Sequence, residues 1–183
     1  MCLKHTMAFT GKFPTRSKIV VDDFILEQVS EYNYLGCHIS FKEDVDIEKK
    51  VGKFQSICGT ISRTLSKKAR KETLMKFYKV MAAPVLLYGS ESWITTKPLE
   101  SRLQAAEMRF LRKVKGCDRR DQIRNDDIRT ELNVYSMNKK VSEYRQQWRE
   151  HIQRMPAGRI PLEILNYQPE GRRDIGRPRK RWQ

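Results

Sequence analysis

The sequence predicts a mainly α-helical protein in which short N-terminal antiparallel β-strands precede a helical bundle and an irregular basic tail. Three observations support this fold class. Residues 1–41 contain short runs of β-branched and aromatic residues separated by Gly, Pro and Asp. From residue 46 onward, apolar residues recur at spacings of three and four, which is the period of an amphipathic helix. Residues 157–183 are interrupted by Pro and Gly, so we expect them to be mostly irregular.

The first 41 residues predict four β-strands. Residues 6–9 form a short apolar run that is closed by Gly11 and Pro14. Residues 18–21 and 24–26 flank Asp22 and Asp23, which suit the two-residue turn of a hairpin. Residues 32–39 are rich in aromatic and branched side chains, and we expect them to form one further strand.

Two helices are expected next. The first covers residues 46–65, with Asp44 or Asp46 as the N-cap. The second covers residues 71–83 and is stopped or kinked by Pro84, before an apolar run that we expect to be buried. The residues expected to face inward are Ile47, Val51, Phe54, Cys58, Ile61 and Leu65 in the first helix, and Leu74, Phe77, Tyr78 and Met81 in the second.

Three more helices follow. A helix over residues 98–115 has Pro near its start and Gly116 after its last turn, which is the expected asymmetry. A short helix, capped by Asn125 or Asp126, runs to Leu132, and a longer one capped by Ser136 ends at Pro156. The predicted core positions are Leu99, Leu103, Ala106, Phe110, Leu111 and Val114, and then Met137, Val141, Tyr144, Trp148, Ile152 and Met155.

The charge favours a polyanionic partner. The 183 residues contain 37 Lys and Arg against 22 Asp and Glu, a formal net charge of +15, which points first to nucleic acid. Residues 1–48 hold five basic and eight acidic residues, so the positive charge lies after them. No apolar run reaches the roughly 20 residues that span a bilayer, and the first residues lack an apolar leader. We therefore expect no membrane contact, and a nuclear or cytoplasmic rather than a secreted protein.

Basic residues are concentrated in residues 67–71 and 172–181 and on the polar side of the helix over residues 98–115. Each of the two clusters could contact phosphates or serve as a nuclear-import signal, and the first could also be a solvated turn between helices. The residues expected to bind nucleic acid are Lys67, Lys68, Arg70, Lys71, Arg109, Arg112, Lys113, Lys115, Arg119, Arg120, Arg124, Arg172, Arg173, Arg177, Arg179, Lys180 and Arg181.

The residues give no indication of a catalytic centre or a metal site. Asp22 and Asp23 could be read as the paired carboxylates that hold Mg²⁺ in polymerases, but no Asp or Glu precedes them, and a hairpin turn explains them better. The four aspartates between residues 118 and 127 alternate with arginines, so ion pairs and capping explain them better than a nuclease site does. The four cysteines are scattered, which indicates reduced thiols.

Six phrases, taken together, closely resemble the C-terminal part of the reverse transcriptase of LINE-type (non-LTR) retrotransposons, of the RTE-like and Jockey-like kind. They are YNYLGCHIS (32–40), PVLLYGSESW (84–93), AAEMRFLR (105–112), RRDQIRNDDIR (119–129), RQQWREHIQRM (145–155) and GRPRKRW (176–182). The resemblance covers essentially the whole chain in order and spacing.

The resemblance implies a division into three parts. Residues 1–43 would be a remnant of the polymerase palm, with Tyr34, Leu35 and Gly36 in the hairpin that grips the primer. Residues 44–116 would be a thumb-like helical bundle, and residues 117–183 a basic helical extension ending in an irregular tail. RNA and DNA, bound without sequence preference, are the expected partners, and the palm and endonuclease parts of the element are further ones.

The chain departs from the family pattern at the catalytic centre. In the family the catalytic Asp-Asp pair lies well before the Tyr-Leu-Gly strand, whereas Asp23 lies only 11 residues before Tyr34. We therefore expect a truncated fragment of an RNA-directed DNA polymerase that retains the region that grips template and primer. We expect it not to be an enzyme on its own and to need no cofactor, since Mg²⁺ would belong only to the intact parent enzyme. The alternative is a domesticated scaffold or protein-interaction module derived from the same element.

Overall fold

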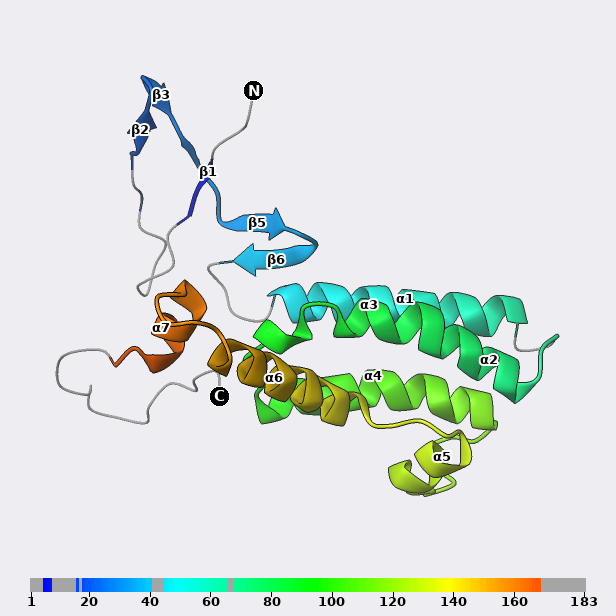
Figure 1. Ribbon diagram of the computed structural model, residues 1–183. Coiled ribbons are helices and arrows are strands. Elements are labelled where there is room, and N and C mark those ends of the chain that lie inside the picture. Colours follow the sequence, from blue (N-terminus) through cyan, green and yellow to red (C-terminus); the bar gives the residue numbers. More distant parts are fainter. Residues whose placement is uncertain (1–4, 8–15, 17, 41–44, 66–67, 169–183) are drawn as a thin grey trace. The chain divides into compact units, whose positions relative to one another are not determined.

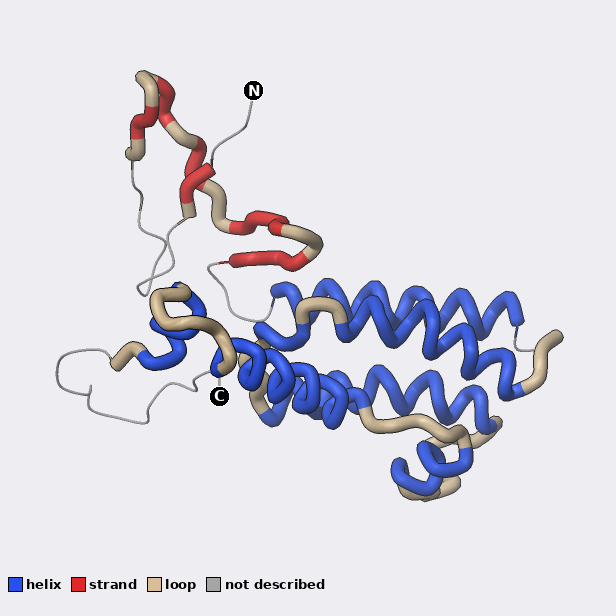
Figure 2. Tube along the Cα trace, viewed as in Figure 1, coloured by secondary structure: helices blue, strands red, loops and turns tan. Residues whose placement is uncertain are grey.

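The computed structural model describes residues 5–7, 16, 18–40, 45–65 and 68–168, and it is mainly helical with short N-terminal strands, as predicted. Figures 1 and 2 show the strands at the N-terminal end of the chain and helices through the rest. The chain forms two compact units, residues 1–52 and 53–183, and the boundary falls within the first helix. The three-part division suggested by the resemblance remains a prediction.

The described strands of the first unit form three separate two-stranded pairs. β2 (Val20–Val21) and β3 (Phe24–Ile25) are antiparallel, and Asp22 and Asp23 between them have φ of 50° and 62°. These angles are those of a two-residue hairpin turn, so the predicted turn is confirmed. β1 (His5–Thr6) pairs with β4 (Glu27–Gln28) in parallel, so the prediction of antiparallel strands fails for this pair.

The prediction of one continuous strand over residues 32–39 is wrong, because this segment is a hairpin. β5 (Glu31–Tyr34) and β6 (Cys37–Ser40) are antiparallel, and Leu35 and Gly36 form the turn with φ of 50° and 80°. Leucine rarely adopts a positive φ, so the residue pattern gives little sign of this turn. The hairpin implied by the resemblance is therefore present at Tyr34–Gly36.

The start of α1 (Val45–Leu65) anchors this hairpin. The Asp46 carboxylate accepts a hydrogen bond from the His38 backbone N–H at 2.9 Å, and Lys49 pairs with Glu31 at 2.7 Å. Lys50 is only 4% exposed and bonds the Asp46 carboxylate at 2.7 Å. Asp46 lies inside the first turn, so it is not the N-cap that was predicted, and its alternative, Asp44, lies outside the described residues.

The second unit contains the remaining helices (Figure 1). α4 (Lys97–Lys115) ends at Gly116, which has φ of 84°, so the predicted helix and its glycine cap are confirmed. α5 (Asn125–Glu131), α6 (Met137–Gln153) and α7 (Ile160–Asn166) follow. α7 was not predicted, because residues 157–183 were expected to be mostly irregular, and residues 169–183 lie outside the described part.

Of the two effects predicted for Pro84, a stop or a kink, the stop is wrong, because the helix continues past this residue. α2 (Lys71–Phe77) continues into a π-helical turn, η1 (Tyr78–Ala82), and then into α3 (Ala83–Leu87), which accepts Pro84 in its first turn. The π turn contains an extra residue, so it shifts the buried positions from the predicted Met81 to Ala82 and Ala83. Phe77 and Met81 are 38% and 47% exposed, although both were predicted to face inward.

The core of the second unit is built around the buried ring of Tyr78. This ring stacks on Phe110 with centroids 5.3 Å apart and meets Phe54 edge-on at 6.0 Å. All six core positions predicted for α4 are buried, as are Phe54, Cys58 and Ile61 of α1. On α6 the predicted stripe is buried at Met137, Val141 and Ile152, whereas Tyr144 and Trp148 are 42% and 40% exposed.

In the part of the chain that the structure describes, no helix is long and apolar enough to cross a bilayer.

Candidate nucleic-acid interface

Three basic segments that are far apart in the sequence meet at one end of the second unit. The start of α2, the end of α4 and α5 lie at the same end of the helices in Figure 1. Glu131 of α5 confirms this proximity, because its carboxylate lies 2.6 Å from the Lys115 ammonium and 3.9 Å from that of Lys71. We call this region the basic end; it contains Lys68, Arg70, Lys71, Arg109, Arg112, Lys113, Lys115, Arg119, Arg120 and Arg124.

Four of these cations surround an open hollow of about 390 Å³ on the outer side of α4. α4 contributes residues at positions i, i+3, i+4, i+7 and i+8, which form one helical face. The chain after Gly116 closes the other side. The hollow is lined by Ala105, Met108, Arg109, Arg112, Lys113, Cys117, Asp118 and Arg119, so three arginines and a lysine face a single carboxylate.

The four basic side chains at the hollow differ in their hydrogen-bond and ion-pair partners. Arg109, Lys113 and Arg119 make no ion pair with another residue in the described part of the chain, and all three are exposed. Arg112 is partly buried, and its Nη2 donates to the Asn125 side chain at 2.8 Å and to the Ile123 carbonyl at 3.3 Å. Arg112 therefore fixes the loop after α4, whereas the other three are available to an anion.

The carboxylate at the hollow is already used by the backbone. Asp118 accepts a hydrogen bond from the Arg120 N–H at 2.6 Å, and its own N–H donates to Asp121 at 2.8 Å. Asp126 pairs with Arg129 at 3.0 Å. Local contacts therefore account for Asp118, Asp121 and Asp126, and the net charge facing the hollow is positive.

The Lys115 ammonium is paired with the Glu131 carboxylate. Its hydrogen bond with Glu131 raises the pKa of Lys115 and lowers the pKa of Glu131, and both side chains remain in contact with solvent. Lys115 therefore joins α4 to α5 at the basic end. Lys68 and Arg70 lie in the exposed turn before α2, and Arg120 and Arg124 in the loop before α5.

The buried face of α4, opposite the hollow, carries a polar cluster that the residue pattern did not predict. Glu107 of α4 has no exposed surface and accepts hydrogen bonds from Arg129 Nη2 at 2.8 Å and Nε at 3.2 Å. Its other oxygen accepts from the Met137 N–H at 3.2 Å and from the Tyr78 hydroxyl at 3.4 Å. Burial raises the pKa of Glu107, while the bonds from Arg129 oppose this rise.

Glu107 also replaces a predicted cap. Ser136 occupies the N-cap position of α6 but makes no side-chain capping bond, and Glu107 satisfies the first amide of that helix instead. The sequence spacing could have indicated that Glu107 is buried, because residue 107 lies four residues from both Leu103 and Leu111 on the apolar face of α4. Glu107 thus joins α4, α5, α6 and η1 and holds the basic end in place.

The two carboxylates that could be read as a polymerase metal site occupy a turn. Asp22 and Asp23 are the turn residues of the β2–β3 hairpin. Among the residues that the structure describes, no group of three or more His, Cys, Asp or Glu could hold a metal ion.

The remaining predicted site residues fall into two groups. Tyr34 ends β5, and Leu35 and Gly36 form the exposed turn of the hairpin in the first unit, so their primer-grip role stays a prediction. The other group lies outside the described residues and comprises Lys67, Arg172, Arg173, Arg177, Arg179, Lys180 and Arg181.

Comparisons with known proteins give one relationship. The chain is 24% identical over 164 residues to the uncharacterized transposon-derived protein F52C9.6 of Caenorhabditis elegans. The aligned region covers 86% of this chain and 59% of that protein, so the chain spans less than two thirds of its relative. No family model matches the chain, and no solved structure matches it. The chain is thus distantly similar to a transposon-derived protein.

Proposed function

We propose that the chain is the thumb-like part of a retrotransposon reverse transcriptase, which binds RNA and DNA through their backbone phosphates at the basic end. One observation supports this most directly. Arg109, Lys113 and Arg119 surround the hollow on α4 without ion pairs to other described residues. Exposed cations around a concave surface are suited to phosphates, which carry one charge per nucleotide and no sequence information.

Two further observations support the proposal. The relative from C. elegans is itself transposon-derived, in agreement with the six phrases that resemble LINE-type reverse transcriptases. The fold also brings the basic turn before α2 to the same end as the hollow, so a nucleic-acid backbone could contact both. The palm-like strands and the primer-grip hairpin at Tyr34–Gly36 belong to the same proposal, and we assign no catalysis to this chain.

The first test removes the unpaired cations. The variant Arg109→Ala/Lys113→Ala/Arg119→Ala should bind a fluorescent RNA, a DNA duplex and an RNA–DNA hybrid about tenfold more weakly, by the same factor for unrelated sequences. The matched control Lys53→Ala/Lys97→Ala/Arg159→Ala removes three exposed cations outside the basic end and should change affinity by less than about twofold. Equal losses in the two variants would contradict a site at the hollow.

A second test addresses catalysis. A primer-extension assay with Mg²⁺, a primed RNA template and the purified chain should give no DNA product above that of a heat-denatured sample. Synthesis that disappears in Asp22→Asn/Asp23→Asn would show that the hairpin turn is a catalytic site after all.

A further inference from the structure

The second unit has an apolar surface that its core does not use. Along α2, η1 and α3, the side chains of Phe77, Val80 and Met81 are 38%, 75% and 47% exposed. Tyr88, which follows α3 directly, is 55% exposed. Phe77, Val80 and Met81 lie at positions i, i+3 and i+4 and form a stripe on the solvent side of α2 and η1, and Tyr88 lies just beyond the C-terminal end of α3.

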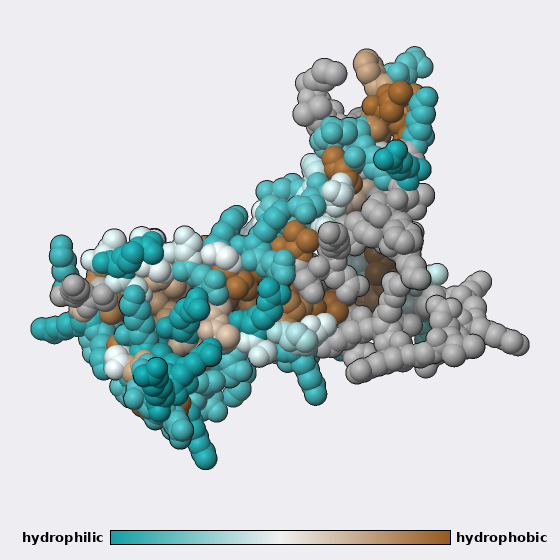
Figure 3. Space-filling model, turned by 180° about the vertical axis from the view of Figure 1, so that it is seen from behind, coloured by the Kyte–Doolittle hydropathy of each residue, from teal (hydrophilic) through white to brown (hydrophobic). Residues whose placement is uncertain are grey.

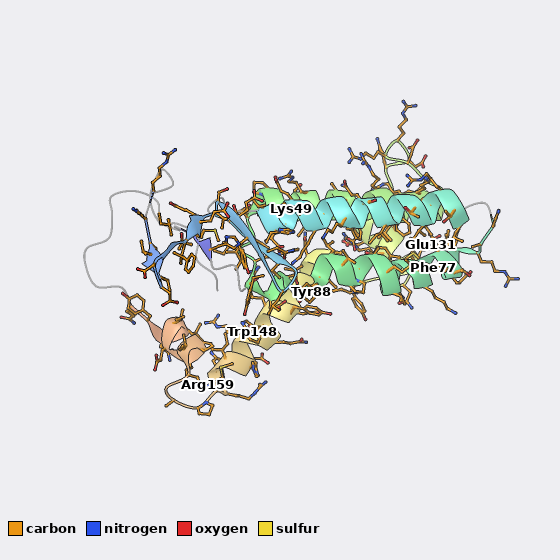
Figure 4. All side chains as sticks on the ribbon, turned by 90° about the horizontal axis from the view of Figure 1, so that it is seen from above. Lys49, Phe77, Tyr88, Glu131, Trp148 and Arg159 are labelled. Atoms are coloured by element: carbon orange, nitrogen blue, oxygen red, sulfur yellow. The ribbon has the colours of Figure 1, made fainter. Side chains whose placement is uncertain are left out.

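A second row of rings lies on α6. Tyr144 and Trp148 are four residues apart and are 42% and 40% exposed. The Trp148 ring lies 5.2 Å from that of His151. α3 packs against α6, and Phe77, Tyr88 and Trp148 lie along the same edge of the helices in Figure 4. We call this surface the aromatic face; it consists of Phe77, Val80, Met81, Tyr88, Tyr144 and Trp148.

The aromatic face is separate from the hollow. The hollow is lined by α4 and the loop after it, whereas the face is formed by α2, η1, α3 and α6. In the view from behind, hydrophilic side chains dominate the part of the surface around α5, at the lower left of Figure 3. Scattered apolar residues on a surface need no explanation, but four exposed aromatic rings on elements that pack against one another indicate a binding surface.

The charges around the face favour an anionic partner. Lys76 and Lys79 are exposed beside Phe77 on α2 and η1, and Lys140 and Arg149 lie on α6. Glu143 and Glu150 also lie on α6, and Glu150 accepts a hydrogen bond from Gln146 at 2.8 Å. A second copy of this chain would bring its own charge of +15, which opposes self-association.

We propose that the aromatic face binds single-stranded nucleic acid by stacking of unpaired bases on Phe77, Tyr88 and Trp148. Base stacking on aromatic rings is sequence-tolerant, because every base has a π-face, and neighbouring cations supply the backbone contacts. A duplex hides the faces of its bases, so this surface selects single strands. The inference rests on the proposed function and assigns different contacts to the two surfaces. The hollow contacts phosphates in any nucleic acid, and the aromatic face contacts bases only where they are unpaired.

The experiment compares ring-removing and ring-conserving variants. Phe77→Leu/Trp148→Leu removes two rings and keeps apolar side chains, so it should bind a fluorescein-labelled oligouridine about tenfold more weakly and a DNA duplex as wild type does. Phe77→Tyr/Trp148→Phe keeps the rings and should retain single-strand affinity. The matched control Tyr135→Leu/Tyr167→Leu removes two rings that are 72% and 71% exposed elsewhere and should bind both ligands normally.

The outcomes separate the two proposals. If the Leu variant binds oligouridine as wild type does, or if the ring-conserving variant loses as much affinity as the Leu variant, the stacking inference is overturned while the phosphate site stands. If the Leu variant instead abolishes a self-association seen with the wild type, the face is a protein interface and the inference is again overturned. If the wild-type chain binds neither ligand, the proposed function itself fails, and the inference fails with it.

Discussion

The buried pair of Glu107 and Arg129 makes a strong prediction about stability. Arg129→Met removes the guanidinium that donates to Glu107 at 2.8 and 3.2 Å, while the carboxylate stays in a site with no exposed surface. Breaking one partner of a buried ion pair costs about 3–5 kcal/mol, because the remaining charge is left uncompensated. Since domains are stable by only about 5–15 kcal/mol, the loss should be large in urea unfolding followed by helical circular dichroism.

The pH dependence of the stability shows whether the buried Glu107 carboxylate causes the loss in Arg129→Met. Burial raises the pKa of Glu107 in the folded state, so folding is favoured when the carboxyl is protonated and loses this contribution as pH rises through the raised pKa. Removing Arg129 removes the groups that oppose this rise. The stability deficit of Arg129→Met relative to wild type should therefore be greatest above the raised pKa and should narrow as pH falls below it.

Two further variants complete this test. Glu107→Gln/Arg129→Met has no buried charge and should recover much of the lost stability, because the amide can still accept from the Met137 N–H. Arg154→Met, at an exposed position on the C-terminal end of α6, should change the free energy of unfolding by no more than about 0.5 kcal/mol. A cost below about 1 kcal/mol for Arg129→Met, or a deficit that does not change with pH, would refute this account of the buried pair.

Four other predictions follow from particular positions. Gly116→Ala, at φ of 84° with open space around the added Cβ, should cost about 1 kcal/mol of stability in urea unfolding, since only the backbone conformation opposes it. Leu35→Gly relieves a positive φ at an exposed turn and should slow hydrogen exchange of the β5 and β6 amides. Burial raises the pKa of the Cys58 thiol to about 12, so iodoacetamide at pH 8 should label Cys58 only after unfolding, as read by peptide mass spectrometry. Replacing Arg177, Arg179, Lys180 and Arg181 with Ala should weaken binding equally for all sequences, and unchanged affinity would remove the tail from the proposed interface.

The sequence predicts the helices that follow a regular period. α4 was predicted with its core positions and its glycine cap, because its apolar residues keep one period over five turns and Pro and Gly mark its ends. The hairpin at Asp22 and Asp23 was predicted for a similar reason, since Asp tolerates the backbone angles of the turn. Local rules are sufficient in both segments.

The failures occur where tertiary contacts override local rules. The π turn at Tyr78–Ala82 inserts a residue that a period of 3.6 does not reveal, so Met81 was placed in the core. Leu35 adopts a turn conformation that its residue type disfavours. Ser136 was predicted to cap α6, but Glu107, 29 residues earlier in the chain, bonds the first amide instead.

The candidate site was predicted in part. Charge counting identified the cations, but it could not say which are free. The fold places Arg109, Lys113 and Arg119 around the hollow, whereas Lys115 and Arg112 hold α5 and its preceding loop. This distinction depends on partners more than ten residues away, which no local pattern contains.

The salt dependence of binding tests the central proposal most directly. Each phosphate contact contributes about 0.9 to the slope of log affinity against log salt on B-DNA. Titrating a DNA duplex between 50 and 200 mM salt should therefore give a slope for Arg109→Ala/Lys113→Ala/Arg119→Ala that is smaller than wild type by about 2 to 3, with an unchanged slope for Lys53→Ala/Lys97→Ala/Arg159→Ala. Equal slopes for wild type and the first variant would contradict phosphate binding at the hollow.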